Sequence, residues 1–263
     1  MDARQAAQEI WTRWQAGTRI DHLPAACRPR SRAEGYAAQA QLPAVSGRGV
    51  AGWKIAATSA GGQAHINVSG PLAGRILQGQ MCAPGATLSA AGNFMRVAEP
   101  ELAFGFARDL PPRERPYSER EVLDAVGALH TALEVPSSRF TDFTKAGEAQ
   151  LLADNACAHQ FILGPAVRAD WRGADLATHK VMGTVTKADG KAWTREGSGA
   201  AVLGDPRKAL CWLVNELRGL GVTLRAGEFV TTGTCMPPLE MEPGDRVEAD
   251  YGAFGLLGMR FAA

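Results

Sequence analysis

The segment VAEPELAFGF, residues 97–106, constrains the fold most, because it places two glutamates inside an apolar run with the composition of a buried strand. Side chains two positions apart on a strand point to the same face, so we expect Glu99 and Glu101 to lie side by side. Carboxylates in apolar surroundings take up a proton or pair with a cation, and a divalent metal suits a site where several oxygens converge. The segment therefore predicts a strand that brings two carboxylates to one site.

A third glutamate extends this pattern. Glu134 lies in TALEV, residues 131–135, a short apolar segment that follows the expected strand after one intervening helix. A strand, helix, strand order would bring Glu134 beside the other two carboxylates. Three carboxylates with no histidine or thiolate close in sequence are typical of oxygen-ligated Mg²⁺ or Mn²⁺ sites. The alternative is that Glu99 and Glu101 lie on an exposed strand face and that Glu134 pairs with an arginine such as Arg139.

Composition and charge exclude several classes of protein. The 263 residues suffice for a substantial core, and 28 basic against 27 acidic residues leave a formal net charge of +1. We therefore expect no nucleic-acid partner and no membrane partner, and no apolar stretch approaches the roughly 20 residues of a membrane span. The N-terminal sequence lacks the order of a signal peptide, and the five scattered cysteines indicate neither a disulfide framework nor a zinc site. We expect a soluble, cytoplasmic protein.

The expected elements mix helices and strands irregularly. Helices are predicted from amphipathic spacing and capping residues over residues 2–17, 31–43, 118–130 and 205–221. Strands are predicted over residues 52–58, 96–106, 161–167, 179–193 (a hairpin), 228–234, 244–251 and 256–261. This irregular order predicts the α+β class rather than a doubly wound sheet. We expect an N-terminal helical lobe over residues 1–70, with a soft boundary, and a catalytic domain over residues 71–263.

Six segments, read in order, resemble the 2-oxopent-4-enoate hydratase and 2-oxo-3-hexenedioate (4-oxalocrotonate) decarboxylase family of the fumarylacetoacetate hydrolase superfamily. They are GWKIAATS (52–59), AEPELAF (98–104), ALEVPSSRFTDF (132–143), ADNACAHQFILG (153–164), GSGAAVLGDPRKALCWLVNEL (197–217) and AGEFVTTGT (226–234), followed by PGDRVEADYGAFG. Each segment is weakly specific alone, but together they span nearly the whole chain. The resemblance implies a mixed β-roll core with flanking helices, and a divalent metal held by Glu99, Glu101 and Glu134.

The resemblance also implies a function. A family member would be a metal-dependent lyase that acts on a short unsaturated 2-oxo acid through a metal-stabilised enolate. Hydration of a 2-hydroxy-2,4-dienoate, in the catabolism of aromatic compounds, is the leading hypothesis, and decarboxylation of a 2-oxo-3-hexenedioate is the alternative. An acylpyruvate-type C–C hydrolase and a non-catalytic partner subunit also stay open. We expect a homo-oligomer, alone or in complex with a paralogous pathway enzyme.

Lys54 is the expected catalytic residue. It lies in GWKIAATS between apolar neighbours, where partial desolvation would lower its pKa, and the resemblance implies proton transfer or substrate binding at this position. Further substrate-binding residues that the resemblance implies are Ser59, Leu72, Asp154, Thr232 and Gly233. Structural roles are the alternative for several of them, such as a turn at Ser59 or at Asp154. His65 is a weaker candidate for proton transfer, and neither Cys157 nor Cys235 has a sequence context that would supply a base.

Leu72 marks a departure from the hydratases of the family. They typically carry GVDxPDFG where this chain has NVSGPLAG, residues 67–74, so their two aspartates fall on Ser69 and Leu72. An alkyl side chain cannot transfer a proton. Because decarboxylases of the family tend to have an aliphatic residue at the second position, Leu72 favours decarboxylation, or a hydration that uses water and Lys54.

Overall fold

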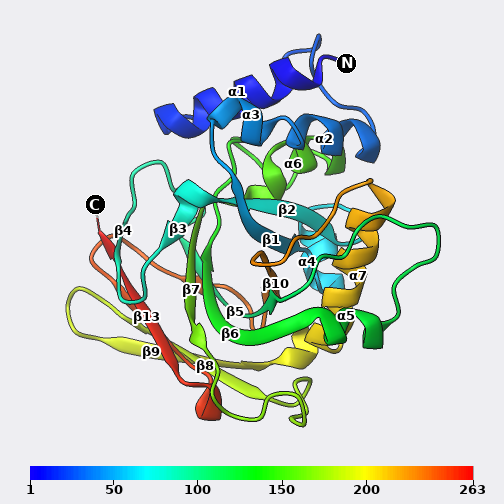
Figure 1. Cartoon of the computed structure of the whole chain (residues 1–263). Helices are drawn as coiled ribbons and strands as arrows, with labels where there is room; N and C mark the ends of the chain where they lie inside the picture. Colours follow the sequence, from blue (N-terminus) through cyan, green and yellow to red (C-terminus); the bar gives the residue numbers. More distant parts are fainter. Residues whose placement is uncertain (263) are drawn as a thin grey trace.

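Two β-sheets of unequal size, flanked by helices, make up the computed structural model, which describes residues 1–262 (Figure 1). The helices are α1 (Ala3–Ala16), α2 (Arg32–Gln39), α3 (Leu42–Ser46), α4 (Ala60–His65), α5 (Glu119–Ala125), α6 (Glu148–Ala153) and α7 (Pro206–Gly219), with short 3₁₀ turns η1 (Gln78–Gln80), η2 (Asn155–Cys157), η3 (Gly199–Ala201) and η4 (Gly252–Phe254). The strands are β1 (Val50–Ala56), β2 (Leu72–Leu77), β3 (Met81–Cys82), β4 (Thr87–Ser89), β5 (Val97–Phe106), β6 (Val126–Val135), β7 (Gln160–Ala166), β8 (Lys180–Thr186), β9 (Ala192–Ser198), β10 (Phe229–Thr234), β11 (Leu239–Glu240), β12 (Arg246–Asp250) and β13 (Leu256–Ala262). Within residues 1–262, no helix is both long and apolar enough to span a membrane.

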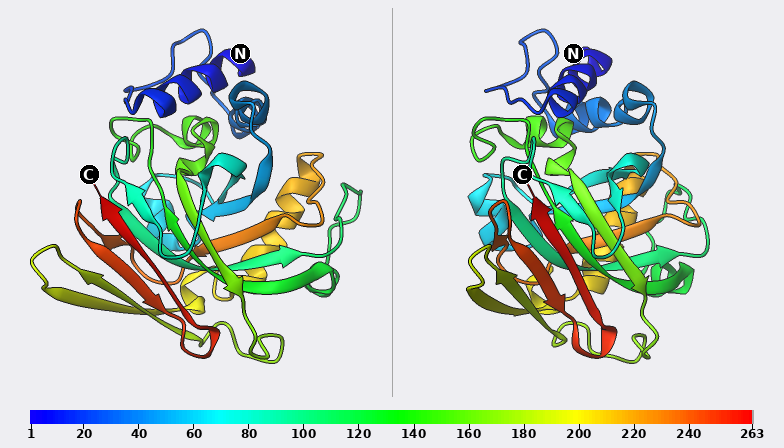
Figure 2. Two further views of the ribbon diagram at one scale, coloured as in Figure 1. Left: turned by 60° about the vertical axis from the view of Figure 1, so that its left-hand side comes forward. Right: turned by 90° about the vertical axis from the view of Figure 1, so that its left-hand side faces the viewer.

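The larger sheet is mixed and has the order β2-β1-β10-β5-β6-β7-β3, with β11 paired to β5. β1 runs parallel to β10 and β3 runs parallel to β7, while the other pairs are antiparallel. The smaller sheet has the order β4-β13-β12-β8-β9. Figure 2 shows the two sheets curling toward each other, and one apolar core contains residues of both, such as Leu133 and Val247. The predicted α+β class, with a mixed β-roll and flanking helices, is confirmed.

The N-terminal helices form a layer over α6 at one end of the larger sheet (Figure 1). α1 begins after Asp2, whose carboxylate accepts a hydrogen bond from the Gln5 amide, and ends at Gly17, which has a positive φ. A small core that includes Ile10 and Phe140 joins this layer to the chain that follows β6. The helical layer ends at Ser46, and β1 already lies inside the larger sheet, so the boundary near residue 70 stays a prediction.

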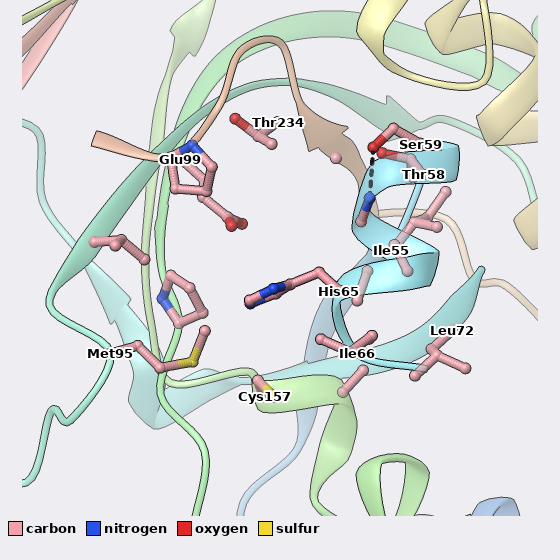
Figure 3. Close-up of a pocket in the computed structure, with 18 of the residues that line it drawn as sticks. Ile55, Thr58, Ser59, His65, Ile66, Leu72, Met95, Glu99, Cys157 and Thr234 are labelled. Carbon is pink, nitrogen blue, oxygen red and sulfur yellow. Dashed lines mark hydrogen bonds between the residues drawn. The ribbon is translucent and has the colours of Figure 1, made fainter. Parts of the chain in front are cut away.

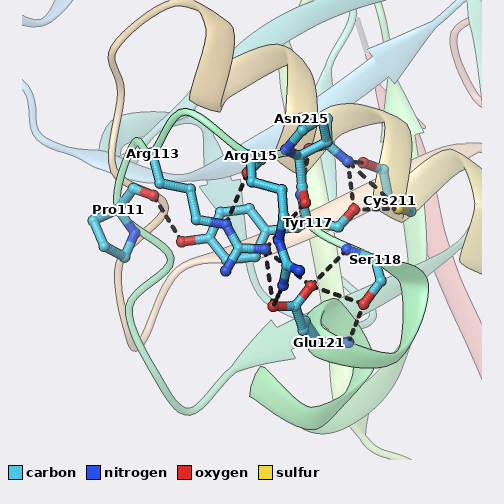
Figure 4. Close-up of polar contacts among 9 residues, drawn as sticks. Pro111, Arg113, Arg115, Tyr117, Ser118, Glu121, Cys211 and Asn215 are labelled. Carbon is cyan, nitrogen blue, oxygen red and sulfur yellow. Dashed lines mark hydrogen bonds and ion pairs between the residues drawn. The ribbon is translucent and has the colours of Figure 1, made fainter.

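The connection from β5 to β6 decides where the third glutamate lies. α5 begins at Ser118, where Ser118 and Glu121 form the predicted capping box: the Ser118 hydroxyl accepts from the Glu121 amide, and the Glu121 carboxylate accepts from the Ser118 amide (Figure 4). Asn215 of α7 exchanges two hydrogen bonds with the backbone of Tyr117, at 2.8 and 2.9 Å. The start of α5 is thus fixed to α7.

α5 is shorter than the sequence predicts. The amphipathic pattern predicts a helix up to His130, but α5 ends at Ala125 and the next residue begins β6. β6 pairs with β5 along nearly its full length, and this backbone pairing overrides the helical spacing. The chain therefore returns antiparallel to β5.

Candidate metal and substrate site

Three glutamates converge where β5 and β6 pair. Glu99 lies directly opposite Glu134, and Glu101 follows Glu99 on the same face of β5. One carboxylate oxygen of each residue lies within 4.8 Å of the others. Glu101 and Glu134 are both 0% exposed, whereas Glu99 is half-buried and lines a cavity (Figure 3).

Burial and mutual repulsion disfavour the charged form of these carboxyls. The pKa of Glu99 is raised to about 7, first by burial and then by the charge of Glu134. Burial, Glu134 and Glu99 raise the pKa of Glu101 well above its usual range. Burial also raises the pKa of Glu134, although the ammonium of Lys54 opposes this shift. A cation in addition to Lys54 would therefore be needed to keep all three carboxylates ionised at neutral pH.

Several of the buried carboxylate oxygens have no hydrogen-bond donor. Oε2 of Glu101 accepts from the Thr231 hydroxyl and, at 2.8 Å, from the Gly233 amide. Within residues 1–262, Oε1 of Glu101 and both oxygens of Glu134 accept no hydrogen bond. An unsatisfied buried acceptor costs roughly 1–3 kcal/mol, and a bound cation would remove that cost. Lys54 forms an ion pair with Oε1 of Glu134, but Oε1 of Glu101 and Oε2 of Glu134 have neither an ion pair nor a hydrogen bond in the described chain, and buried carboxylate oxygens of this kind fit Mg²⁺ or Mn²⁺.

Lys54 of β1 approaches the same cluster. Its Nζ lies 3.0 Å from Oε1 of Glu134 and donates to the Ala156 carbonyl at 3.0 Å. The predicted lowering of its pKa is wrong for this environment. Burial alone lowers the pKa of Lys54, but the charges of Glu134, Glu99 and Glu101 raise it by more, so the net direction is upward. The sequence showed the apolar neighbours of Lys54 and not the carboxylates that other strands bring to it.

A left-handed turn presents the carbonyl that Lys54 contacts. Asn155, Ala156 and Cys157 have φ values of +57°, +51° and +61°, a conformation that costs of order 1–3 kcal/mol for each non-glycine residue. The Asn155 side chain fixes the turn, because its Oδ1 accepts from the Arg75 amide and its Nδ2 donates to the Arg75 carbonyl, both at 2.7 Å. The acceptor for Lys54 is therefore held by the β2 backbone.

A cavity of about 820 Å³ opens beside the carboxylates (Figure 3). The predicted residues that line it are Lys54, Ser59, Leu72, Glu99 and Gly233. Glu101 and Glu134 lie outside the lining and reach the cavity only through their neighbours Glu99 and Lys54. Five of the predicted site residues thus share one cavity, next to a buried carboxylate cluster.

Ser59 and Gly233 have structural tasks within this lining. The Ser59 hydroxyl accepts from the Gly62 amide at 3.0 Å and caps α4, so the turn-forming alternative is observed, and a substrate contact by Ser59 stays a prediction. Gly233 has φ +105°, and a Cβ there would lie 2.4 Å from the Thr58 hydroxyl. Glycine is thus required where the backbone amide meets Glu101.

Asp154 and Thr232 lie outside the cavity lining. The Asp154 carboxylate pairs with the Arg139 guanidinium and accepts from the Ser138 hydroxyl at 2.7 Å. The Thr232 hydroxyl donates to the Leu102 carbonyl at 3.0 Å. The structure therefore gives both residues structural partners and brings neither to the cavity, and Arg139 pairs with Asp154 rather than with a glutamate of the cluster.

His65, the weaker candidate for proton transfer, and Cys157, which the sequence did not favour as a nucleophile, both line the cavity. The His65 ring packs edge-on against Phe143, with ring centroids 5.8 Å apart. Burial, and then the charge of Asp154, raise the pKa of the Cys157 thiol to about 12. Burial also raises the pKa of Cys235. Neither thiol is activated as a nucleophile.

Two groups that hold the site were not singled out from the sequence. Thr231 donates to Glu101, and strand alternation in VTTGT could have identified it, since Thr231 and Gly233 share a face. The Ala156 carbonyl that holds Lys54 is a backbone group and leaves no side-chain signal.

Comparisons with known proteins give a family. The model of the fumarylacetoacetate (FAA) hydrolase C-terminal family matches residues 78–262. The chain is 31% identical over 260 residues to the 2-keto-4-pentenoate hydratase of Paraburkholderia xenovorans (strain LB400), covering 98% of this chain and 94% of that protein. It is 28% identical over 206 residues to a 4-oxalocrotonate decarboxylase of a Pseudomonas species, covering 78% and 76%. The structure of 4-oxalocrotonate decarboxylase from Pseudomonas putida G7 with magnesium and adipate matches with a TM-score of 0.85 at 25% identity, covering 98% and 97% of the two chains.

Proposed function

Because this chain belongs to the fumarylacetoacetate hydrolase family, we propose that it is a divalent-metal-dependent lyase acting on a short unsaturated 2-oxo acid. The observation that carries the proposal is the convergence of three carboxylates, with unpaired buried oxygens, beside a cavity. Its relatives are hydratases and decarboxylases, and both are lyases. The leading form of the proposal is hydration of a 2-hydroxy-2,4-dienoate, since 2-keto-4-pentenoate hydratases match over nearly the whole chain.

Glu99, Glu101 and Glu134 would hold Mg²⁺ or Mn²⁺. When bound, the cation would stabilise the negative charge that develops on the 2-oxo oxygen of the substrate. The donor set fits this ion, because it consists of carboxylate oxygens alone and three of them lack hydrogen bonds in the described chain. A described structure of the decarboxylase relative contains magnesium.

Lys54 would carry the proton in the reaction. Its Nζ reaches the cavity from β1 and is oriented by the Ala156 carbonyl and by Glu134. From this position Lys54 would donate a proton to the terminal carbon of the bound dienol, whose enol hydroxyl loses its proton to solvent, and water would then add at the fourth carbon of the unsaturated ketone. Gly233, through its amide, holds Glu101 in place.

Decarboxylation is the second candidate, and Leu72 is the observation that favours it. Leu72 is fully buried and lines the cavity at the position where hydratases of this family carry an aspartate. An aliphatic wall supplies no proton donor or acceptor for water addition. In this form, carbon dioxide leaves the substrate and the carbonyl end receives the electron pair.

Turnover by the purified chain tests the proposal. With Mg²⁺, we expect loss of the dienol absorbance of 2-hydroxypenta-2,4-dienoate or of 2-hydroxymuconate, and no loss when the metal is chelated. A 4-hydroxy-2-oxo acid as product identifies a hydratase, whereas released carbon dioxide identifies a decarboxylase. Absence of turnover with every such substrate would contradict the proposal and leave a non-catalytic subunit. Exposed Glu248→Gln is the matched control for changes at the cluster.

We also propose a cytoplasmic homo-oligomer that acts on a small molecule, alone or together with a paralogous pathway enzyme. The family resemblance supports the assembly. Light scattering on the purified chain tests it, and a single monomeric species at micromolar concentration would contradict it.

A further inference from the structure

Most residues that line the cavity are apolar; Lys54 and Glu99 are its charged residues, and Thr58, Ser59, His65 and Thr234 are its other polar ones. Figure 3 places Ile66 and Leu72 well away from Glu99. Other apolar residues of the lining include Ile55, Met95, Phe143 and Leu151. A 2-oxo acid that binds with its polar head at the carboxylate cluster would thus extend its tail toward aliphatic and aromatic side chains.

Among the described residues, the lining offers no free lysine or arginine for a second carboxylate. Among the described residues that line the cavity, there is one lysine, Lys54, and no arginine. The ammonium of Lys54 already contacts Glu134 and the Ala156 carbonyl. The exposed Arg19 guanidinium stacks 4.5 Å over the ring of Phe94, a lining residue, but Arg19 itself does not line the cavity. A distal carboxylate would therefore be desolvated without a partner, which lowers affinity strongly.

The size of the cavity points the same way. Pockets of roughly 300–1,000 Å³ accommodate drug-sized ligands, and this cavity has about 820 Å³. A five-carbon acid would leave most of the apolar part unfilled. Each further methylene that enters an apolar pocket strengthens binding by roughly fourfold.

We propose that the substrate has an apolar tail longer than a vinyl group: an alkyl- or aryl-substituted 2-hydroxy-2,4-dienoate rather than a dicarboxylate. This inference rests on the proposed function, because it assumes that the 2-oxo acid head binds at the carboxylate cluster. The inference favours hydration over the decarboxylation candidate, whose substrate carries a second carboxylate, and it makes Leu72 part of the wall that selects the tail.

Two saturated ligands test the preference directly. 2-Oxohexanoate and 2-oxohexanedioate differ only in a terminal methyl group against a terminal carboxylate. Calorimetric titration of the full chain with Mg²⁺ should show the monoacid binding at least about tenfold tighter. 2-Oxooctanoate should bind tighter than 2-oxobutanoate, by roughly fourfold for each methylene buried. Equal or tighter binding of 2-oxohexanedioate would overturn the inference.

A matched pair of variants locates the effect in the cavity. Ile66 is half-buried, so Ile66→Lys should fold. This variant should strengthen binding of 2-oxohexanedioate by about tenfold or more. Ile66→Leu should leave the affinity for both ligands nearly unchanged. His65→Ala should leave the dicarboxylate affinity unchanged. A loss of dicarboxylate affinity in His65→Ala would show that His65 receives the second carboxylate, and the inference would fail.

The failure of this inference differs from the failure of the proposed function. Mg²⁺-dependent binding of oxalate, a head-group analogue, together with a preference for dicarboxylates would overturn only the inference about the tail. No binding of oxalate or of any 2-oxo acid would contradict the proposed function itself.

Discussion

Two buried ion pairs, Lys54–Glu134 and Arg139–Asp154, have similar burial and very different hydrogen bonding. The Asp154 carboxylate accepts from the Ser138 hydroxyl at 2.7 Å and from the Arg139 amide at 3.1 Å, in addition to its guanidinium partner. The Arg139 guanidinium also donates to two further backbone carbonyls, at 2.6 and 2.9 Å. Glu134, in contrast, has Lys54 as its one cationic partner in the described chain and accepts no hydrogen bond.

This difference in hydrogen bonding indicates a structural role for Arg139–Asp154 and supports the proposed ligand-binding role of Lys54–Glu134. In a buried ion pair whose oxygens all accept hydrogen bonds, no acceptor is left for a ligand. In a buried ion pair whose oxygens lack hydrogen bonds, those oxygens raise the free energy of the folded state until a further group binds them. Asp154 and Glu134 look alike in sequence, as acidic residues in apolar segments, and only hydrogen-bond saturation tells them apart.

Glu101→Gln should have the largest effect, and it should lower turnover and metal binding without destabilising the metal-free protein. We expect kcat/KM to fall by about 10³-fold or more, as for loss of a principal charge-stabilising group. The free energy of unfolding without metal should stay the same or rise, because an amide removes repulsion inside the cluster. Steady-state kinetics and urea unfolding measure the two effects. Turnover as high as that of Glu248→Gln would refute the assigned site.

Asp154→Asn should act mainly on stability. Because Arg139 would keep a buried charge without its partner, the free energy of unfolding should fall by about 3–5 kcal/mol. Mg²⁺ affinity and turnover per folded molecule should change by less than about threefold. Exposed Asp142→Asn serves as the control and should leave unfolding nearly unchanged. A stable Asp154→Asn variant without activity would instead support the substrate contact that the family resemblance implies for Asp154.

Mg²⁺ should stabilise the protein through the glutamate cluster at Lys54–Glu134 and not through the Arg139–Asp154 pair. At a hundredfold excess over its Kd, the metal should raise the free energy of unfolding by about 2.7 kcal/mol. Glu101→Gln should lose this increment, and Asp154→Asn should retain it. Urea unfolding at increasing Mg²⁺ concentrations measures it, and a wild-type protein whose unfolding ignores Mg²⁺ would argue against a metal at the cluster.

The smallest expected effect is on the pH dependence of stability, through His159 near the Arg139–Asp154 pair. Burial, and then the charge of Arg139, lower the pKa of His159 from 6.5 to about 4. The unfolded chain therefore binds more protons between these pH values, so this contribution to stability is complete above pH 6.5 and is lost as the pH falls toward 4. We expect roughly 1–2 kcal/mol for this half-buried ring. His159→Gln should flatten that part of the stability profile, and an unchanged slope would remove His159 as its source.

The sequence predicts those parts of the site that depend on local order. Strand alternation placed Glu99 and Glu101 on one face, and the strand, helix, strand order placed Glu134 opposite them. Along β10, strand alternation puts Thr231 and Gly233 on the face that meets the carboxylates, whereas the family resemblance had pointed to Thr232. Thr231, rather than Thr232, therefore holds the cluster.

The sequence patterns did not predict properties that depend on contacts between distant segments. The pKa of Lys54 is set by carboxylates from two other strands, and the end of α5 is set by pairing with β5. The apolar cavity wall combines residues as far apart as Met95, Phe143 and Met236. Patterns within one segment carry no information about such neighbours.

The left-handed turn at residues 155–157 limits which features of this site can change during evolution. Lys54 is held by a main-chain carbonyl, so the contact depends on the backbone conformation at Ala156 and on no polar side chain there. What must persist is the handedness of three residues and the Asn155 side chain that pins them to β2. The orientation of the Lys54 ammonium therefore depends on backbone shape, which the residue type at position 156 does not reveal.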